Sequence, residues 1–298
     1  MKDTKYHTPV MVEEVLEYLQ PKAGKTYLDV TFGGGGHTKS ILDANEECNV
    51  IGLDWDLNSI DKQGEKLEEV YGDRLHLLWG NFAQLYRIFK KAGIKKVDGI
   101  LADFGTSMFQ IKNRPGFSFS TETFLDMRMS PSHQKVTAAE VLSRSDEKTL
   151  KEIFLKYGEE HQAAKVASLI VEERKKRSIK TTKQLVEIVE KVIPRYKRTI
   201  HPATKVFQAL RIFVNSELDN ISSFLSSVPR FLNPNGRLVC ISFHSLEDRL
   251  VKQFLKSQKE LLAEKINILT PRVVVPTEEE IKRNPPSRSA KFRAAEFL

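Results

Sequence analysis

The sequence has little cysteine and no long hydrophobic run, and both shortages narrow what the protein can be. Cys48 and Cys240 are the only two cysteines in 298 residues, and without CxxC spacing they form neither a disulfide framework nor a metal site. No window approaches the ~18 uninterrupted apolar residues of a membrane-spanning helix. The N-terminal segment has neither the apolar core of a signal peptide nor the acid-poor composition of a transit peptide. We therefore expect a cytoplasmic protein without a membrane partner, in which both cysteines are core thiols.

The seven histidines likewise show no metal-binding spacing, so no metal is expected. Positive charge, in contrast, is in excess: the formal net charge is +8, which favours a polyanionic partner. Glu172 to Lys205 contains eleven Lys or Arg against four Glu, and Lys282 to Arg293 contains five basic residues and no acid. A solvated helix face and an exposed tail have the same pattern, so charge alone leaves both interpretations open.

The first third of the chain alternates apolar runs with helical periodicity, which is typical of βαβ units and a mainly parallel sheet. The opening amphipathic segment predicts a helix with Thr8 as its N-cap and Pro9 in its first position. Strands are predicted at 26–31, 49–54, 75–79 and 97–103, with helices near 37–44, 57–70 and 82–92 between them. The expected fold class is therefore α/β.

After Asp103 the pattern changes to helices without a convincing strand pair. Helices are predicted at 146–156, 160–177, 182–193 and 203–231, followed by an NPNG turn and the apolar strand RLVCISF. PRVVVP and AKFRAAEF near the end predict a closing hairpin of the same sheet. A crossover between parallel strands needs only about a dozen residues, and the segment between Asp103 and Arg237 is far longer, which indicates an insertion. We expect a discontinuous domain at 1–107 and 203–298, interrupted by a helical domain at 108–202.

Four consecutive glycines, Gly33 to Gly36, follow the first predicted strand and precede a helix. A dinucleotide fingerprint needs GxGxxG, and its third glycine is replaced by Thr38 or Lys39, depending on the starting position. A phosphate-binding P-loop needs a second glycine where Thr38 stands, so an NTPase is the weaker alternative. The third ligand class is S-adenosylmethionine (SAM), a sulfonium cation without phosphate. A glycine turn shaped only for packing is the interpretation without a ligand.

Acidic residues at the predicted strand ends favour SAM, because ligands of an open α/β sheet bind there. Asp54 ends the second strand, where an acid can meet the ribose hydroxyls, and Asp29 ends the first, either to meet the ammonium group or to brace the loop. Asn81 and Phe82 follow the third strand, where the adenine is expected. Asp103 ends the fourth, nearest the expected position of the transferred methyl group.

Eight blocks spread over nearly the whole chain, among them DVTFGGGGHTKSIL and HPATKVFQALRIFVNSEL, resemble the bacterial RsmH (MraW) family of small-subunit ribosomal RNA cytosine-N4 methyltransferases. The resemblance implies a Rossmann-like class I SAM-dependent methyltransferase sheet with an inserted all-helical lobe for RNA recognition. It implies SAM as cofactor and methyl transfer to N4 of a cytosine in 16S rRNA, decoding-centre cytosine 1402 in the family. The implied partner is small-subunit ribosomal RNA or the assembled small ribosomal subunit. The family's cofactor contacts fall on Gly35, Gly36, His37, Asp54, Phe82, Asp103 and Gln110.

One block departs from the family pattern. DFGTSMFQIK stands where the family reads DLGVSSPQLD, and it retains Asp103, Gly105, Ser107 and Gln110. The methyl donor and the acceptor base are expected to meet at this block, so its changes leave two alternatives to the family's activity open. One is a paralogue with a different RNA target, and the other is a SAM-binding ribosome-assembly module without catalysis.

Asp103 is the candidate catalytic residue, as an acceptor that orients the cytosine amine, and a backbone carbonyl beside it is the alternative acceptor. Phe104 and Phe109 either stack on the base or belong to the core. The candidates for RNA contact are Arg128, Lys205, Arg211, His244, Arg288 and Arg293. The alternatives are exposed helix positions for Lys205 and Arg211, and a cap of the following helix for His244.

Overall fold

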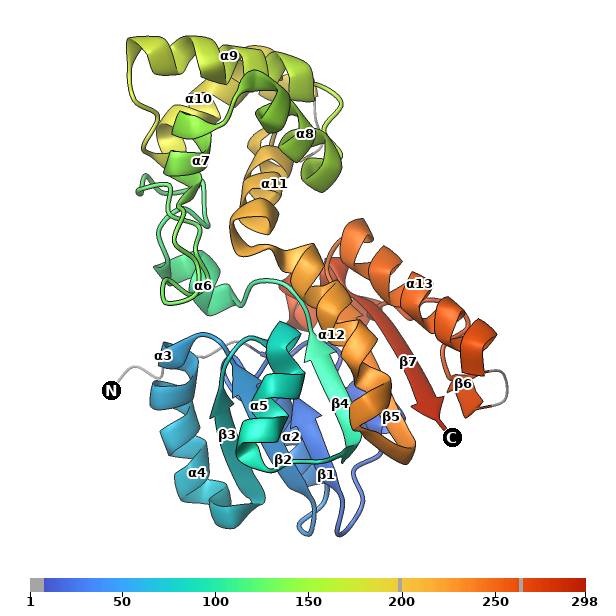
Figure 1. Cartoon of the computed structure of the whole chain (residues 1–298). Coiled ribbons are helices and arrows are strands. Elements are labelled where there is room, and N and C mark those ends of the chain that lie inside the picture. The colour runs from blue at the N-terminus through green and yellow to red at the C-terminus, as the bar shows by residue number, and fades with distance from the viewer. Residues whose placement is uncertain (1–7, 198–199, 263–264) are drawn as a thin grey trace. The chain divides into compact units, whose positions relative to one another are not determined.

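The computed structural model describes residues 8–197, 200–262 and 265–298, and the chain divides into two compact units. Unit 1 contains Met1–Gly105 and Leu218–Leu298, and unit 2 contains Thr106–Glu217. Figure 1 shows the sheet of unit 1 and the helices α6 to α11 of unit 2. The sheet unit is therefore discontinuous in sequence.

A mixed seven-stranded sheet forms the centre of unit 1 and confirms the expected Rossmann-like α/β class. Its order is β3-β2-β1-β4-β5-β7-β6, and β7 runs antiparallel to both of its neighbours. The strands are β1 (Thr26–Asp29), β2 (Asn49–Asp54), β3 (Leu75–Trp79), β4 (Val97–Asp103), β5 (Leu232–Ser242), β6 (Ile266–Ile268) and β7 (Lys291–Phe297).

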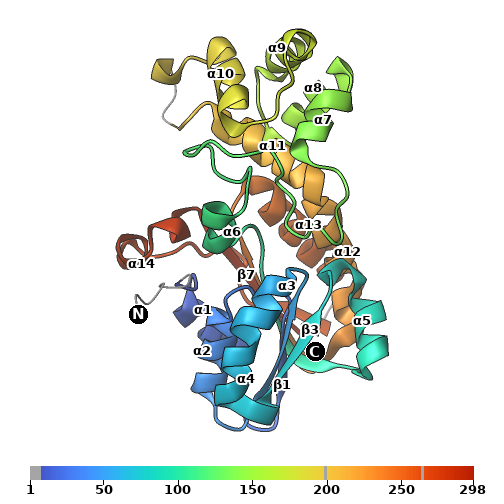
Figure 2. The ribbon, with the colours of Figure 1, turned by 90° about the vertical axis from the view of Figure 1, so that its left-hand side faces the viewer.

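Helices cover both faces of this sheet, which is why its strands are apolar on both sides. The helices of unit 1 are α1 (Val12–Leu19), α2 (Gly36–Ala44), α3 (Leu57–Ser59), α4 (Glu65–Tyr71), α5 (Leu85–Ala92), α12 (Glu217–Phe231), α13 (Ser245–Leu262) and α14 (Glu278–Arg283). One core joins α5, α12 and α13 to the sheet and includes Phe224 and Leu255. The other joins α1, α2 and α4 to it and includes Val15 and Ile41. Figure 2 shows the sheet between these two helical layers.

Most predicted strands match the structure, because each is a short apolar run between polar or turn residues. The predictions at 49–54, 75–79 and 97–103 are confirmed in full, while β1 ends before the predicted residue 31. The predicted closing hairpin is confirmed only for β7. Its hairpin partner is β6, and PRVVVP makes an isolated bridge through Val274.

The first helix begins later than its capping signals predicted. Met11 has a left-handed φ of 54°, so α1 starts at Val12, and Thr8 and Pro9 lie outside it. The Met11 backbone N–H donates to Glu280 Oε1 at 3.3 Å. This contact with α14, at the other end of the chain, competes with a local cap and is invisible to local sequence patterns.

The helices of unit 2 are α6 (Met108–Asn113), α7 (Ala138–Arg144), α8 (Glu147–Gly158), α9 (Ala163–Lys176), α10 (Thr182–Val192) and α11 (Ala203–Asn215). Helices α7 to α11 pack around one apolar core. Phe154, Val166 and Val206 belong to the core, and side chains such as Thr137 and Thr181 cap helix N-termini. Within the described ranges, no helix of the chain is both long enough and apolar enough to cross a membrane.

The long helix predicted at 203–231 is two helices in the structure. Ser216 has φ 50° and ψ 39°, a left-handed conformation that ends α11, and α12 starts at Glu217. Val206 of α11 belongs to the core of unit 2, whereas Phe224 of α12 belongs to that of unit 1. The predicted return to the sheet domain at residue 203 is therefore too early. Continuous apolar periodicity concealed a single left-handed residue.

Gly158 offers a test of the packing between α8 and α11. A Cβ at this position would lie 2.6 Å from the carbonyl oxygen of Lys205 and 3.2 Å from Cβ of Ala209. Alanine favours a helix over glycine by about 1 kcal/mol, but overpacking against backbone costs about 1–3 kcal/mol. We expect Gly158→Ala to lower the free energy of unfolding by about 1 kcal/mol, measured by urea denaturation. Ser168→Ala on the exposed side of α9 is the control and should be neutral or slightly stabilising; a gain in both variants would contradict the predicted contact.

Candidate cofactor-binding site

Three aspartates end three neighbouring parallel strands. The strand order reverses at β1, which lies between β2 and β4. Asp29, Asp54 and Asp103 are the last residues of β1, β2 and β4. Ligands of open α/β sheets bind at the carboxyl ends of strands beside such a reversal. The fold therefore brings these predicted residues to one edge of the sheet.

The glycine loop between β1 and α2 needs glycine for its backbone and its packing. Gly33 and Gly35 have φ of 53° and 72°, in the left-handed region that side chains disfavour. A Cβ on Gly35 would also overlap the Leu67 side chain. A Cβ on Gly36 would lie 3.1 Å from the Pro9 ring. Packing therefore explains part of the need for glycine here, in agreement with the alternative in which the turn is shaped for packing.

Asp54 ties the end of β2 to this loop. Its Oδ2 accepts a hydrogen bond from the Gly33 backbone N–H at 2.7 Å, and its Oδ1 accepts one from Asp56 N–H at 2.8 Å. Burial raises the pKa of Asp54 to about 7, and the two backbone hydrogen bonds oppose this only in part. Asp54 is therefore poised to change its charge near neutral pH.

Asp29 is hydrogen-bonded to residues on both sides of the glycine loop, in agreement with its predicted role of bracing that loop. Its carboxylate accepts hydrogen bonds from Thr31 N–H at 3.1 Å, from Thr31 Oγ1 at 3.3 Å and from Thr38 Oγ1 at 2.8 Å. Burial is the main reason why the pKa of Asp29 is raised. Thr31 Oγ1 also accepts from Asp103 N–H at 2.7 Å, which joins the ends of β1 and β4.

These two threonines were missed as site residues by the sequence analysis. Their signal was present, because hydroxyl residues at Thr31 and Thr38 flank the glycine loop on both sides. Such residues commonly hydrogen-bond backbone and carboxylate groups in turns.

His37 and Asp103 carry polar atoms without partners. His37 Nε2 lies 3.6 Å from Asp103 Oδ2, with side-chain exposures of 7% and 17%. Both ring nitrogens of His37 and Oδ1 of Asp103 are buried and have no hydrogen-bond partner among the described residues. Burial alone would lower the pKa of His37, but the carboxylates of Asp103 and Asp29 outweigh it and raise that pKa. Buried polar atoms rarely remain unsatisfied, so this edge of the sheet is suited to a polar ligand.

Phe82, the predicted adenine neighbour, begins a short 3₁₀ turn after β3. Its ring packs against Phe224 with centroids 5.5 Å apart and against Phe104 at 6.1 Å. Asn81 caps this turn by accepting from Ala83 N–H at 2.9 Å. Phe104 is only 2% exposed, so its core alternative is confirmed and stacking on a base is wrong for it.

Gln110, the remaining predicted cofactor residue, belongs to unit 2. Its Oε1 accepts from Ser107 N–H at 3.2 Å, and its own N–H donates to Ser107 Oγ at 3.2 Å, which together form the capping box of α6. Two residues retained in the divergent DFGTSMFQIK block thus have a structural role. The expectation for Phe109 lies outside the described side chains.

The P-loop alternative finds no support in Lys39. Its Nζ donates to Asp43 Oδ2 at 2.6 Å and to the Tyr71 hydroxyl at 3.2 Å. The lysine that would bind phosphate in an NTPase is therefore hydrogen-bonded to Asp43 and Tyr71 instead.

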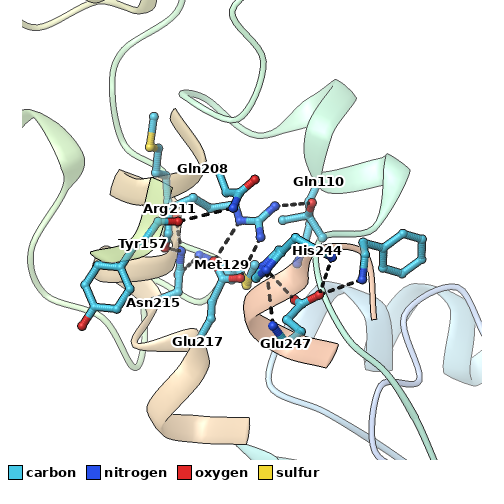
Figure 3. A network of polar contacts seen from close by, with 12 residues as sticks. Gln110, Met129, Tyr157, Gln208, Arg211, Asn215, Glu217, His244 and Glu247 are labelled. Atoms are coloured by element: carbon cyan, nitrogen blue, oxygen red, sulfur yellow. Dashed lines mark hydrogen bonds and ion pairs between the residues drawn. The ribbon is translucent and has the colours of Figure 1, made fainter. Parts of the chain in front are cut away.

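Several predicted RNA contacts are internal contacts in the structure. Arg128 binds Asp126 through Nε at 2.7 Å and Nη2 at 2.9 Å, and Lys205 Nζ donates to the Glu159 carbonyl at 2.8 Å. Arg211 binds Glu217 at 2.9 and 2.8 Å, as Figure 3 shows.

Arg293 pairs with Asp248 of α13 at 2.6 and 3.1 Å and is 9% exposed, so the structure gives it an internal ion pair, and its contact with RNA stays a prediction. Among the predicted cations, Arg288 is exposed. The positive charge of these motifs therefore serves mainly to satisfy carboxylates and carbonyls inside each unit.

His244 caps α13, as its alternative interpretation proposed. Its Nδ1 accepts from Glu247 N–H at 3.4 Å, while Glu247 Oε2 accepts from His244 N–H at 3.3 Å and from Phe243 N–H at 2.7 Å. Figure 3 shows this reciprocal arrangement around Glu247. The pattern is that of a capping box in which histidine occupies the N-cap.

Comparison with known proteins identifies the family. Residues 4–298 match the sequence pattern of the MraW methylase family. The chain belongs to this family. It is 46% identical to a Sulfurihydrogenibium protein named ribosomal RNA small subunit methyltransferase H, over 96% of this chain and 97% of that protein. It is 40% identical to a protein of the same name from Carboxydothermus hydrogenoformans, over 98% of each. A solved putative methyltransferase from Streptococcus mutans in complex with SAH aligns with 96% of this chain and 95% of its own, with 11% identity and a TM-score of 0.41.

Membership in the MraW methylase family makes the chain a SAM-dependent methyltransferase. The residues at the sheet edge fit that cofactor: the glycines carry no side chains that would keep a ligand from the backbone, Asp54 offers a carboxylate, and His37 and Asp103 have polar atoms without hydrogen-bond partners among the described residues.

The pKa of Asp54 leads to a prediction for cofactor binding. If the carboxylate accepts the ribose hydroxyls, a proton must leave Asp54 before SAM binds below pH 7. We expect the dissociation constant for SAM to be nearly constant above pH 7 and to rise toward tenfold for each unit below it. Calorimetric titrations between pH 5.5 and 8.5 would measure this. Asp54→Asn should bind more weakly with a flatter profile; an unchanged slope in that variant would assign the titration to another group, such as His37.

The Arg293–Asp248 pair predicts a stability effect rather than an RNA effect. Arg293→Ala leaves a poorly exposed carboxylate without its partner, and we expect a loss of about 3–5 kcal/mol in urea unfolding. The double variant with Asp248→Ala should recover part of the loss. Arg288→Ala, at an exposed position, should change stability by less than about 0.5 kcal/mol. Unchanged stability of Arg293→Ala together with weaker RNA binding would support the predicted RNA contact instead.

Proposed function

We propose that this methyltransferase transfers the methyl group of SAM to the exocyclic N4 of a cytosine in small-subunit ribosomal RNA, with the decoding-centre cytosine 1402 as its target. The observation that carries the proposal is the full-length similarity to proteins named ribosomal RNA small subunit methyltransferase H, at 40% and 46% identity. The substrate is then the RNA itself or the assembled small ribosomal subunit.

The sheet edge has the side chains that such a reaction needs. SAM supplies a methyl group made electrophilic by its positive sulfur. In the proposal, backbone of Gly35 and Gly36, with His37 and Gln110, contacts the cofactor. Asp54 takes the ribose hydroxyls and Phe82 lies against the adenine.

Asp103 is the proposed catalytic residue. The lone pair of a cytosine amine is delocalised into the ring, so the amine is a weak nucleophile until it is oriented and polarised. Oδ1 of Asp103 has no hydrogen-bond partner among the described residues and can accept one N–H of that amine. This would align the nitrogen with the methyl group. The N–C bond then forms as the S–C bond of SAM breaks, S-adenosylhomocysteine leaves, and the methylated amine gives its extra proton to solvent. Since β4 and the backbone hydrogen bond to Thr31 fix the position of Asp103, little reorganisation is needed.

We assign RNA recognition to the helical lobe, Thr106–Glu217, and to the basic residues exposed on it. Lys175, Lys180 and Lys183 are exposed on or beside α9 and α10. Such cations contact phosphates without reading sequence, so RNA affinity should fall steeply with salt.

Mass-spectrometric mapping of methylated nucleosides tests the target. Small-subunit RNA from cells with and without the protein should differ at one N4-methylcytosine, and the purified protein with SAM should restore it. Methylation of another base would reveal a paralogue with a different target. Tight SAM binding without transfer to RNA or subunits would favour a ribosome-assembly module.

Two variants separate cofactor binding from turnover. Asp54→Ala should weaken SAM binding, while Asp103→Ala should chiefly lower kcat, by about a hundredfold or more. Asp61→Ala removes an exposed acid of the same unit and serves as the control. Full activity in both site variants would overturn the assignment of these residues.

A further inference from the structure

Unit 2 contains a pocket whose lining residues are not among those assigned to the cofactor. Its volume is about 170 Å³. Phe117 and Phe119 line it from the loop after α6, and Thr204, Phe207, Gln208 and Arg211 line it from one face of α11. Three aromatic rings and a few polar groups around a concave space are typical of sites for small planar ligands.

The aromatic wall is held in place before any ligand binds. The Phe119 ring stacks on His201 with centroids 4.5 Å apart and meets Phe207 edge-on at 5.3 Å. His201 is fixed in turn, because its Nδ1 accepts from Ala203 N–H at 3.2 Å and its Nε2 lies 3.4 Å from Glu190 Oε1. A rigid aromatic surface loses little conformational entropy when another ring stacks on it.

The neighbouring backbone is also constrained. Gly116 has φ 88°, and a Cβ there would lie 2.8 Å from Asp126 N and 2.9 Å from Met127 N. Asn215 of α11 donates to the Met127 carbonyl at 2.7 Å. It also accepts from Met129 N–H at 2.7 Å, and Figure 3 shows these two residues. The backbone around Gly116 and the segment Met127 to Met129 is therefore held against α11 in a fixed conformation.

The charge of the pocket argues against a phosphate ligand. Arg211 is its only cationic lining residue among those described, and its guanidinium binds both carboxylate oxygens of Glu217 and the Thr106 hydroxyl. The positive charge is thus compensated within unit 2. Gln208 donates to the Tyr157 carbonyl at 3.3 Å, which orients its amide, and Thr204 adds a hydroxyl. The lining is aromatic and polar but close to neutral.

From this juxtaposition we propose that the pocket lined by Phe117, Phe119, Phe207, Thr204, Gln208 and Arg211 binds one unpaired nucleobase of the RNA substrate. The inference rests on the proposed function for its RNA. Sequence-tolerant recognition of single-stranded RNA uses aromatic side chains on which bases stack, and amide and hydroxyl groups pair with base edges. The lobe then holds RNA by a base as well as by phosphate contacts.

Binding of a ten-nucleotide oligocytidylate, compared with an abasic oligonucleotide of equal length and charge, tests the proposal. Fluorescence anisotropy without SAM measures both. We expect the oligocytidylate to bind more tightly, and Phe119→Leu to weaken it by about fivefold to a hundredfold while leaving the abasic ligand unchanged. Gln208→Leu should weaken the oligocytidylate in the same selective way. Phe213→Leu alters a partly exposed phenylalanine on α11 that does not line the pocket, and is the matched control.

Equal affinity for the two oligonucleotides, or unchanged oligocytidylate binding in both folded pocket variants, would overturn the proposal. Thermal melting and SAM affinity of each variant establish that it is folded. The outcome is separate from that of the proposed function, because the binding assay needs no methyl transfer. Base-dependent binding without any cytosine methylation would remove the proposed reaction and keep the pocket. Cytosine methylation with an unchanged KM for RNA in Phe119→Leu would support the proposed reaction and overturn the pocket.

Discussion

The site depends on placing three carboxylates, one buried and two partly buried, at one edge of a sheet, which is unfavourable unless they find hydrogen-bond donors. Asp29 is satisfied by the hydroxyls of Thr31 and Thr38, and Asp54 by two backbone N–H groups. Asp103 is the exception, because its Oδ1 is buried without a partner among the described residues. The structure thus ties Asp29 and Asp54 to the loop by hydrogen bonds and leaves Oδ1 of Asp103 without a partner among the described residues.

Charge pairing within each unit explains why the net charge of +8 is a poor guide to individual contacts. Arg128, Arg211 and Arg293 lie in motifs that suggested RNA binding, yet each binds a carboxylate of its own unit. An arginine fork matches a carboxylate as well as a phosphate, so residue type alone does not distinguish the two partners. Lys175 and Lys183, in contrast, are exposed.

Local patterns were sufficient for most of the sheet and for the acids at its edge. Short apolar runs located β2, β3 and β4 to the residue, because buried parallel strands are apolar on both faces. The same patterns failed where one residue or one distant contact decided the outcome. Ser216 divides a continuous apolar stripe through a left-handed conformation, and Glu280 binds Met11 from the other end of the chain. Neither feature changes the periodicity that sequence analysis measures.

The sequence by itself determined the α/β class, the glycine loop with its strand-end acids, and the family. The first two depend on residues close together in the chain, and the family is indicated by the order of its motifs along the chain. Only the tertiary structure decided which polar groups are satisfied and which remain open. Thr31 and Thr38 became partners of Asp29, His244 became a helix cap, and the aromatic residues of the lobe formed a pocket. The physical reason is that hydrogen bonding and burial depend on distances between segments far apart in sequence, and those distances exist only after the chain has folded.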